Sequence, residues 1–119
     1  MNLSEYTIGP DATLLDAVAK INKNRSRTVL VVESGKLTGL ISEGDVLRAL
    51  LRGVDTHTLA PEVANRSFRF LTHTDRLAAF HLFQQHTFGL VPVVDEAFRL
   101  VDVITLDAIL AQARLVDEA

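Results

Sequence analysis

The stretch TVLVVESGKLTGLIS, residues 28–42, contains an apolar β-branched run, a short turn and a second run of the same kind. This pattern predicts two antiparallel strands, at residues 28–32 and 37–42, joined by a tight turn. The same pattern occurs again as LVPVV at residues 90–94 and RLVDVIT at residues 99–105. The chain is therefore predicted to contain two β-hairpins.

A helical pattern precedes each hairpin and another follows it. Apolar residues recur at helical spacing over residues 14–21 and 77–83, and again over residues 46–51 and 109–113. Short extended segments, YTI at residues 6–8 and FRFL at residues 68–71, come before the first helix of each half. The expected N-caps are Asp11 or Thr13 for one of these leading helices and Thr74 or Asp75 for the other.

The chain is thus one strand–helix–strand–strand–helix unit written twice. An offset of 62 residues aligns Ile8 with Phe70 and Val32 with Val94, and one extra residue in the second turn then aligns Ser42 with Thr105. A unit of about 60 residues has only a marginal core of its own, so we expect the two units to share one core in an α+β fold. The predicted division is a first repeat at 1–56, a connector at 57–66 and a second repeat at 67–119.

Composition excludes several classes of function. The 119 residues are 48% hydrophobic, carry a formal net charge of −3 and include no cysteine. Disulfides and thiol catalysis are excluded, and the charge argues against a general nucleic-acid binder. The first ten residues do not resemble a secretory signal, and no apolar run is long enough to span a bilayer, so we expect a cytoplasmic protein.

The segment GLISEGD, residues 39–45, ends one predicted strand and begins a helix. Ser42 can donate to a phosphate at the helix N-terminus, where free amides and the helix dipole favour anions. Gly44 allows close approach of a ligand, and the Asp45 carboxylate can accept from two ribose hydroxyls. The alternative is that Ser42 and Asp45 only cap the helix, which this stretch alone favours. Arg48 either reaches a bound phosphate or is an exposed helix arginine.

The doubled pattern, with GLISEGDVLRAL closing the first unit and VDVITLDAIL in the second, resembles a tandem pair of CBS domains, also called a Bateman module. The resemblance covers essentially the whole chain. It implies two βαββα repeats packed with pseudo-twofold symmetry, and a regulatory module that binds an adenosyl nucleotide such as AMP, ADP or ATP between them. It also implies a homodimer formed through the helices, with no cofactor required.

The resemblance also implies which residues contact the ligand. The phosphate meets the hydroxyl at 42, the ribose meets the acid at 45, and the base lies against the first strand and the hairpin. The predicted nucleotide-binding residues are Ile8, Gly9, Pro10, Val29, Leu30, Val31, Ser42, Gly44, Asp45 and Arg48. A possible second site comprises Leu71, Thr72, Val91, Pro92 and Thr105.

The second repeat departs from the family pattern. Asp102 replaces the glycine, and Ala108 occupies the position of the ribose-binding acid. Asp107 is one residue early, which turns its side chain by about 100° on a helix. We therefore expect one competent nucleotide site, centred on Ser42 and Asp45, and a weak or altered second one.

A narrower resemblance covers residues 7–66 and includes the run after the hairpin, where Ser42 and Glu43 open the run and Arg48 keeps one of its two arginines. This stretch is similar to the CBS pair at the N-terminus of bacterial sugar-phosphate nucleotidyltransferases, which implies a catalytic domain beyond this chain. The chain itself is not expected to be an enzyme, because its sequence contains no catalytic set of residues. An alternative function is a dimerisation platform with vestigial ligand sites.

Three further features of the sequence bear on possible binding sites: a basic cluster, the histidines and Pro92. The basic cluster Lys20, Lys23, Arg25 and Arg27 is either a solvated helix end or a site for a phosphate or acidic partner, and the solvated end is favoured. The spacing of the histidines does not favour a metal site. Pro92 fits an edge strand or the wall of a cleft better than a central strand.

Overall fold

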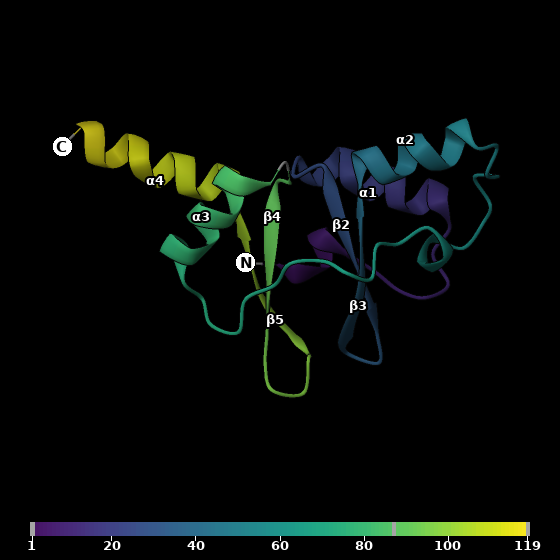
Figure 1. The fold of residues 1–119 in the computed structure, drawn as a ribbon, viewed down its shortest axis with the longest axis horizontal. Coiled ribbons are helices and arrows are strands. Elements are labelled where there is room, and N and C mark those ends of the chain that lie inside the picture. The colour runs from purple at the N-terminus through teal and green to yellow at the C-terminus, as the bar shows by residue number, and fades with distance from the viewer. Residues whose placement is uncertain (1, 87, 119) are drawn as a thin grey trace.

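The computed structural model describes residues 2–86 and 88–118, which form two lobes of strands and helices (Figure 1). Their arrangement is an α+β fold, as the sequence predicts. The elements are η1 (Leu3–Tyr6), β1 (Thr7–Ile8), α1 (Leu14–Asn24), β2 (Thr28–Glu33), β3 (Lys36–Ser42), α2 (Glu43–Leu51), η2 (Ala60–Glu62), α3 (Arg76–Gln85), β4 (Leu90–Val94), β5 (Leu100–Thr105) and α4 (Leu106–Glu118).

The first repeat contains a three-stranded sheet in the order β1-β2-β3. Strand β1 is parallel to β2, and β2 is antiparallel to β3. Ser34 and Gly35 have φ values of 52° and 80°, which are the left-handed conformations that a two-residue hairpin turn with the twist of the strands requires. The predicted first hairpin is confirmed, with each strand one residue longer than expected.

The second repeat contains only a two-stranded sheet, β4-β5. The segment FRFL is not a strand, and only its last residue, Leu71, makes a parallel bridge, to Val93. In the first repeat Ile8 pairs with Val31. Since Val93 lies 62 residues after Val31, Ile8 corresponds to Leu71, and the predicted alignment of Ile8 with Phe70 is wrong by one residue.

The two hairpins match in register. Thr28 pairs with Ser42 and Leu90 pairs with Thr105, which confirms the change in offset from 62 to 63. Both ladders also shift register at the same place, between residues 31 and 32 and between residues 93 and 94. The extra residue lies in the second turn, because Asp95 and Arg99 close a three-residue loop where the first hairpin has two residues.

The helix caps follow the sequence pattern. Thr13 is the N-cap of α1, where its hydroxyl accepts from the Asp16 amide and the Asp16 carboxylate accepts from the Thr13 amide. Asp75 is the N-cap of α3 and accepts from the Ala78 amide at 3.0 Å. Each is one of the two residues predicted for that cap.

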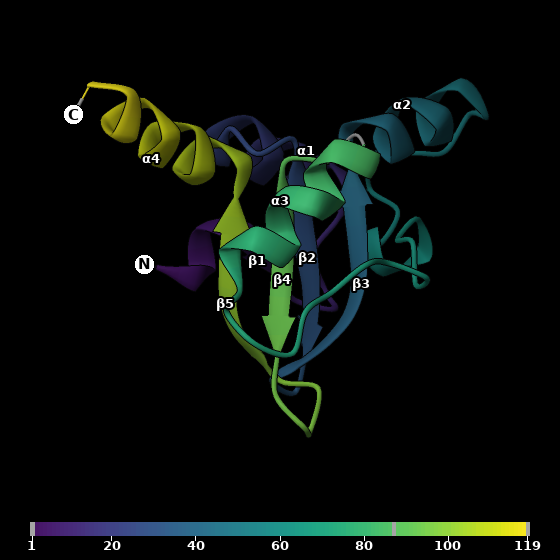
Figure 2. The same ribbon diagram turned by 60° about the vertical axis from the view of Figure 1, so that its left-hand side comes forward.

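Alternating residues of the strands face two different cores. Val29 and Val31 pack under the helices of the first repeat, and Val91 and Val93 pack under those of the second. The residues between them point to a cluster that both repeats build, formed by Leu30, Leu37, Leu40, Leu90, Val94 and Val103. The two repeats therefore share a core, as expected, and Figure 2 shows β2 and β4 next to each other at the centre of the molecule.

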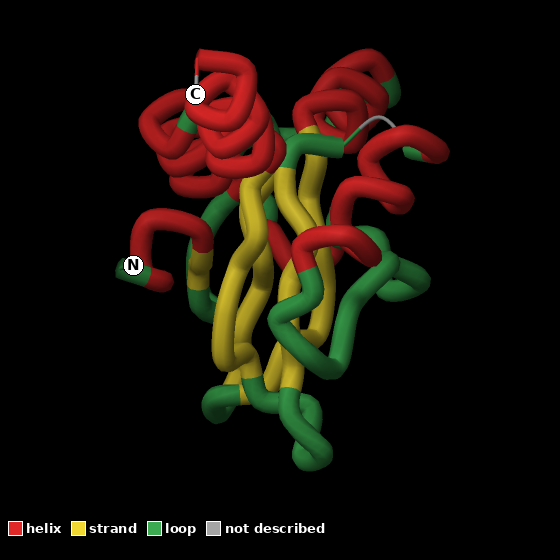
Figure 3. The backbone as a smooth tube through the Cα atoms, turned by 90° about the vertical axis from the view of Figure 1, so that its left-hand side faces the viewer, coloured by secondary structure: helices red, strands yellow, loops and turns green. Residues whose placement is uncertain are grey.

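The repeats are also joined at both ends of the strands. At the hairpin end, which lies away from α1, α2 and α4 in Figure 3, the Leu37 amide donates to the Phe98 carbonyl at 3.0 Å. At the helix end, a Cβ built on Gly89 would lie 2.2 Å from the Ser26 carbonyl oxygen. Only glycine permits this approach, so residue 89 fixes how closely the repeats pack.

Pro92 is a buried residue of β4, one of the two edge strands of the second sheet. Its carbonyl accepts from the Leu71 amide at 2.9 Å, so its nitrogen also faces the side of β4 opposite β5, where the pairing is a single bridge. The missing donor costs no ladder hydrogen bond there, in agreement with the edge position predicted. Within the described residues, none of the helices is long and apolar enough to span a membrane.

Candidate functional site

Ser42 is the N-cap of α2 and forms a capping box with Asp45. The Ser42 hydroxyl accepts from the Asp45 amide at 3.2 Å, and the Asp45 carboxylate accepts from the Ser42 amide at 2.9 Å and from its hydroxyl at 3.0 Å. Such a box satisfies two of the amides that a helix start leaves without partners. The capping interpretation is therefore what the structure shows at this position.

Arg48 completes the polar group at the start of α2. Its guanidinium donates to the second oxygen of the Asp45 carboxylate at 2.7 Å. The same guanidinium folds back over Gly44, where a Cβ would lie 3.3 Å from one of its nitrogens. A ligand that used the Asp45 carboxylate would have to replace its contacts with Ser42 and Arg48.

A cavity of about 340 Å³ lies at this helix start. It is large enough for part of a small ligand. The lining residues are Arg27, Thr28, Ser42, Glu43, Gly44, Leu47 and Arg48. Three of the predicted ligand residues, Ser42, Gly44 and Arg48, thus line one cavity, whereas Asp45 is not among its lining residues. We call this space the α2 cavity.

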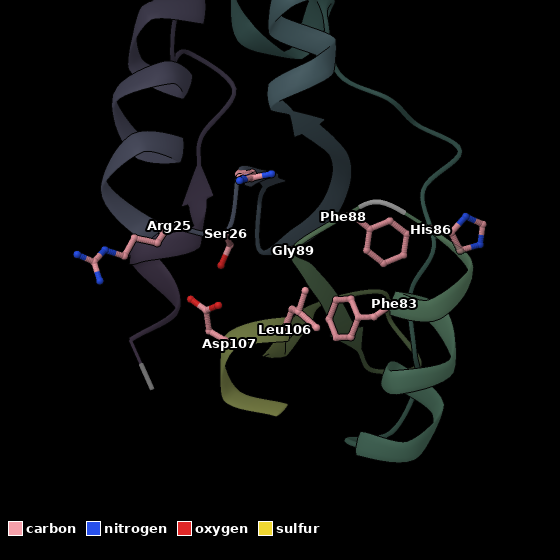
Figure 4. Close-up of a pocket in the computed structure, with 9 residues that line it drawn as sticks. Arg25, Ser26, Phe83, His86, Phe88, Gly89, Leu106 and Asp107 are labelled. Carbon is pink, nitrogen blue, oxygen red and sulfur yellow. The ribbon is translucent and has the colours of Figure 1, made fainter. Parts of the chain in front are cut away.

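A second cavity, of about 400 Å³, lies between the two repeats (Figure 4). Its walls come from the loop before β2, from α3 and the segment before β4, and from the start of α4. The lining residues are Arg25, Ser26, Arg27, Phe83, His86, Phe88, Gly89, Leu106 and Asp107. In Figure 4 the side chains of Ser26 and Asp107 point toward one another across it. We call this space the inter-repeat cavity.

Arg27 lines both cavities. Arg27 and Arg25 adopt φ values of 58° and 62°, which are unfavourable for residues with a side chain. The Arg27 carbonyl accepts from the Glu43 amide at 2.9 Å, and its side chain forms a weak, exposed ion pair with Glu43 at 3.8 Å. The basic cluster predicted at the end of α1 therefore contributes residues to the walls of two cavities.

Tyr6 lies near the inter-repeat cavity. Burial raises the pKa of its hydroxyl, and the negative charges of Glu5 and Asp107 raise that pKa further. Its ring packs against the core that the two repeats share. Tyr6 is therefore neutral at ordinary pH and belongs to the edge of the shared core.

The remaining predicted residues of the first site lie away from the α2 cavity. Ile8 is buried in β1, and Gly9 and Pro10 are exposed after it. The side chains of Val29, Leu30 and Val31 are fully buried in the central strand of the sheet. None of these six residues lines either cavity.

The residues predicted for a second site are mostly buried. Val91 and Pro92 are inside the fold, Leu71 pairs with Val93, and Thr72 is exposed. Thr105 is 6% exposed, and its hydroxyl accepts from the Ala108 amide at 3.1 Å, so it caps α4. None of the five residues lines the inter-repeat cavity.

Asp102 and Asp107 lie in different surroundings in the structure. The Asp102 carboxylate accepts from the Thr74 hydroxyl at 3.0 Å and from the Val103 amide, whereas Asp107 lines the inter-repeat cavity. Among the side chains that the structure describes, no three His, Asp or Glu residues are grouped so that they could hold a metal ion.

Sequence reasoning missed Thr28, Phe83, His86, Phe88 and Gly89 as cavity residues. Thr28 could have been found from the hairpin register, because the residue opposite Ser42 shares its face of the sheet. The other four face the first repeat only once the two repeats are packed together. A single repeat contains no signal for that packing.

Known proteins share this architecture. The family model described as "CBS domain" matches residues 1–52 and 62–114. The magnesium transporter MgtE of Thermus thermophilus is 34% identical over 82 residues, which are 68% of this chain and 17% of the transporter. The chain spans 32% of the length of curated relatives that it matches over 87% of its own length.

Two solved structures show how far the likeness extends. Staphylococcus aureus OpuCA has a TM-score of 0.70 and 26% identity, with 92% of each chain covered. The cytosolic domain of the Mg²⁺ channel MgtE, in complex with ATP, has a TM-score of 0.68 and 27% identity over 90% of this chain and 44% of that one.

Proposed function

Because the chain belongs to the CBS domain family, we propose that it binds an adenosyl nucleotide such as AMP, ADP or ATP and regulates a partner domain in response. The CBS module is a regulatory domain and not a catalytic one. A ligand can shift the module between two arrangements only by binding one of them better. The proposed repeats are 1–56 and 67–119, with residues 57–66 as the connector.

The start of α2 is the observation that carries the proposal. Ser42, Gly44 and Arg48 line a cavity at the N-terminus of a nine-residue helix, where an anionic group is favoured. Asp45 follows the lining residue Gly44 in the sequence. Its carboxylate now accepts hydrogen bonds from the Ser42 hydroxyl and from Arg48, and two ribose hydroxyls could replace these donors. The complex of the MgtE cytosolic domain with ATP supports the choice of nucleotide.

The base side of the site is less polar. Gly9 and Pro10 are exposed and would contact the base, and the buried residues Ile8, Val29, Leu30 and Val31 would support them. A second ligand would use the possible site in the second repeat, which comprises Leu71, Thr72, Val91, Pro92 and Thr105. That site lacks an acid at position 108, so we expect it to bind weakly.

Calorimetric titration of Asp45→Ala with AMP and ATP tests the assignment. Loss of the ribose contacts should lower the affinity for both nucleotides at least about tenfold, because hydrogen bonds to a charged group are the stronger ones. Asp16→Ala is the matched control. It removes the carboxylate at the equivalent position of the α1 capping box and should leave the affinity for both nucleotides unchanged. If Asp45→Ala binds as tightly as the unaltered chain, the assignment is wrong.

A dimerisation platform is the second candidate, and two observations favour it. The capping box already occupies Ser42 and Asp45. In addition, large apolar side chains are exposed on all four α-helices, namely Leu15, Val18, Leu47, Leu50, Leu51, Leu77, Phe80 and Leu110. A homodimer through these faces would cover them, and sedimentation measures it.

A thermal-shift panel of nucleotides separates the two candidates. A sensor at about 100 times the dissociation constant should gain roughly 2.7 kcal/mol of stability, and a pure platform should gain none. A finer proposal is that the module regulates a sugar-phosphate nucleotidyltransferase in the cytoplasm. It rests on the run from Ser42 to Arg48, and the relatives named above do not add to it.

A further inference from the structure

Thr28 carries a buried hydroxyl that the fold leaves without a partner. The residue is 1% exposed, and its Oγ1 makes no hydrogen bond among the described residues. Its carbonyl, in contrast, accepts from the Asn24 side chain at 2.9 Å. An unpartnered buried hydroxyl lowers stability, so its presence in a folded protein calls for an explanation.

The position of Thr28 supplies one. It begins β2 directly opposite Ser42 in the ladder, so the two side chains share one face of the sheet. Both residues line the α2 cavity. The orphan hydroxyl therefore lies beside the first turn of α2. In that turn the Glu43 amide donates to the Arg27 carbonyl and the Asp45 amide donates to the Ser42 hydroxyl.

Two arginines at this cavity can contact an anion that displaces their acidic partners. Arg27 and Arg48 supply two guanidinium groups, and Glu43 and Asp45 offset them. The Arg27–Glu43 pair is long, at 3.8 Å, and highly exposed, so its contribution is small and an incoming anion can replace Glu43. Arginine and helix amides together match the several oxygens of a phosphoryl group.

We propose that the Thr28 hydroxyl donates a hydrogen bond to a phosphoryl oxygen of the ligand and makes the α2 cavity select phosphorylated over unphosphorylated adenosyl ligands. This inference rests on the proposed function and adds a specificity-determining residue to it. Ligand binding gives the orphan hydroxyl its missing partner. Thr28 thus increases the affinity for the phosphate end of the ligand and does not affect binding of the base.

The second repeat lacks each of these groups. Leu90 takes the place of Thr28 opposite Thr105, and it is fully buried in the shared core. By the same register Gly89 takes the place of Arg27, and Ala111 that of Arg48. Selection by phosphate is therefore confined to the first repeat.

Thr28→Val, which keeps the shape of the side chain and removes the hydroxyl, tests the inference in the full chain. Calorimetry with ATP, AMP and adenosine should show a loss of affinity of about tenfold to hundredfold for the two nucleotides. The affinity for adenosine should not change. Thr28→Ser keeps the donor and should restore nucleotide binding.

Thr38→Val is the matched control. Its hydroxyl is partly buried in the same sheet but already donates to the Val31 carbonyl, away from the cavity. This variant should bind ATP, AMP and adenosine as the unaltered chain does. The melting temperature of Thr28→Val without ligand should equal or exceed that of the unaltered chain, because no hydrogen bond is lost, which shows that the variant folds.

The outcomes separate this inference from the proposed function. If Thr28→Val keeps full affinity for ATP and AMP, the inference is overturned and the proposed function stands. A thermal shift with inorganic phosphate covers the other case. A shift that the unaltered chain shows and Thr28→Val loses supports the phosphoryl contact even if no nucleotide binds, and a chain that responds to neither phosphate nor nucleotide overturns both.

Discussion

The starts of α2 and α4 have the same backbone and different chemistry. The Glu43 amide donates to the Arg27 carbonyl at 2.9 Å, and at the corresponding place the Leu106 amide donates to the Gly89 carbonyl at 2.9 Å. Ser42 and Thr105 both cap their helices with a hydroxyl. Beyond the cap the repeats differ, because Asp45 and Arg48 of the first correspond to alanines in the second.

This difference shows that strand register and backbone hydrogen bonds preserve the shape of a helix start without preserving its function. The ladder between Leu90 and Thr105 positions α4 without the aspartate and the arginine that follow the cap of α2. A binding site therefore depends on a few side chains added to a fold that can stand without them. Three experiments on stability test how independent the repeats are.

The largest effect is expected for Gly89→Ala. The new methyl group would meet the Ser26 carbonyl oxygen at 2.2 Å and force the repeats apart, with a loss of about 4 kcal/mol in the free energy of unfolding. Urea denaturation measures it. Gly9→Ala is the control, since nothing lies within 4 Å of its added Cβ, and it should cost less than about 0.5 kcal/mol. Equal losses would show that the approach at Gly89 does not matter.

A smaller loss is expected for Leu30→Ala, which leaves a cavity in the shared core. The cost should be about 3 kcal/mol, within the range for fully buried leucine. Because both repeats use this cluster, fluorescence from a tryptophan introduced at Phe70 and far-UV circular dichroism should report a single, coincident transition. Two separate transitions would mean that the repeats fold independently.

The smallest effect is expected for the loss of stability of the fold at acidic pH. Hydrogen bonds from the Arg99 amide and side chain lower the pKa of Asp95 in the second hairpin turn, and hydrogen bonds from Thr13 lower the pKa of Asp16 in the first repeat. A carboxyl with a lowered folded pKa stabilises the fold above its unfolded pKa, and that contribution disappears as pH falls through the folded value.

Asp95→Asn should therefore lose less stability than the unaltered chain between pH 7 and about pH 3, as followed by the urea midpoint. Asp16→Asn should do the same in the other repeat. An unchanged pH dependence in both variants would contradict the contribution of these carboxylates. Since both groups are exposed, we expect only a small difference.

The sequence predicted the hairpins, the caps and the duplication, because each depends on residues close together in the chain. It did not predict that the second repeat lacks the strand corresponding to β1, since FRFL has a strand-like composition but its phenylalanines pack elsewhere. Phe68, Phe70 and Phe98 form a cluster of their own, with Phe70 and Phe98 ring centroids 4.9 Å apart.

The candidate site was predictable only in part. The motif around Ser42 is local, so its residues were found, whereas Thr28 depends on strand register and the inter-repeat cavity depends on how the repeats pack. The competition between capping and ligand contacts at Asp45 is also visible only in three dimensions. It depends on Arg48 folding back along the helix.

The shared core also bears on how such a chain could have arisen. Leu30, Leu37 and Leu40 form one half of an interface whose other half, Leu90, Val94 and Val103, comes from equivalent strands. A single ancestral unit with the same apolar strand face would have been able to cover it with a second copy of itself. Gene fusion would then have turned an assembly that depended on concentration into one that each molecule completes alone, which freed one half to lose its polar residues.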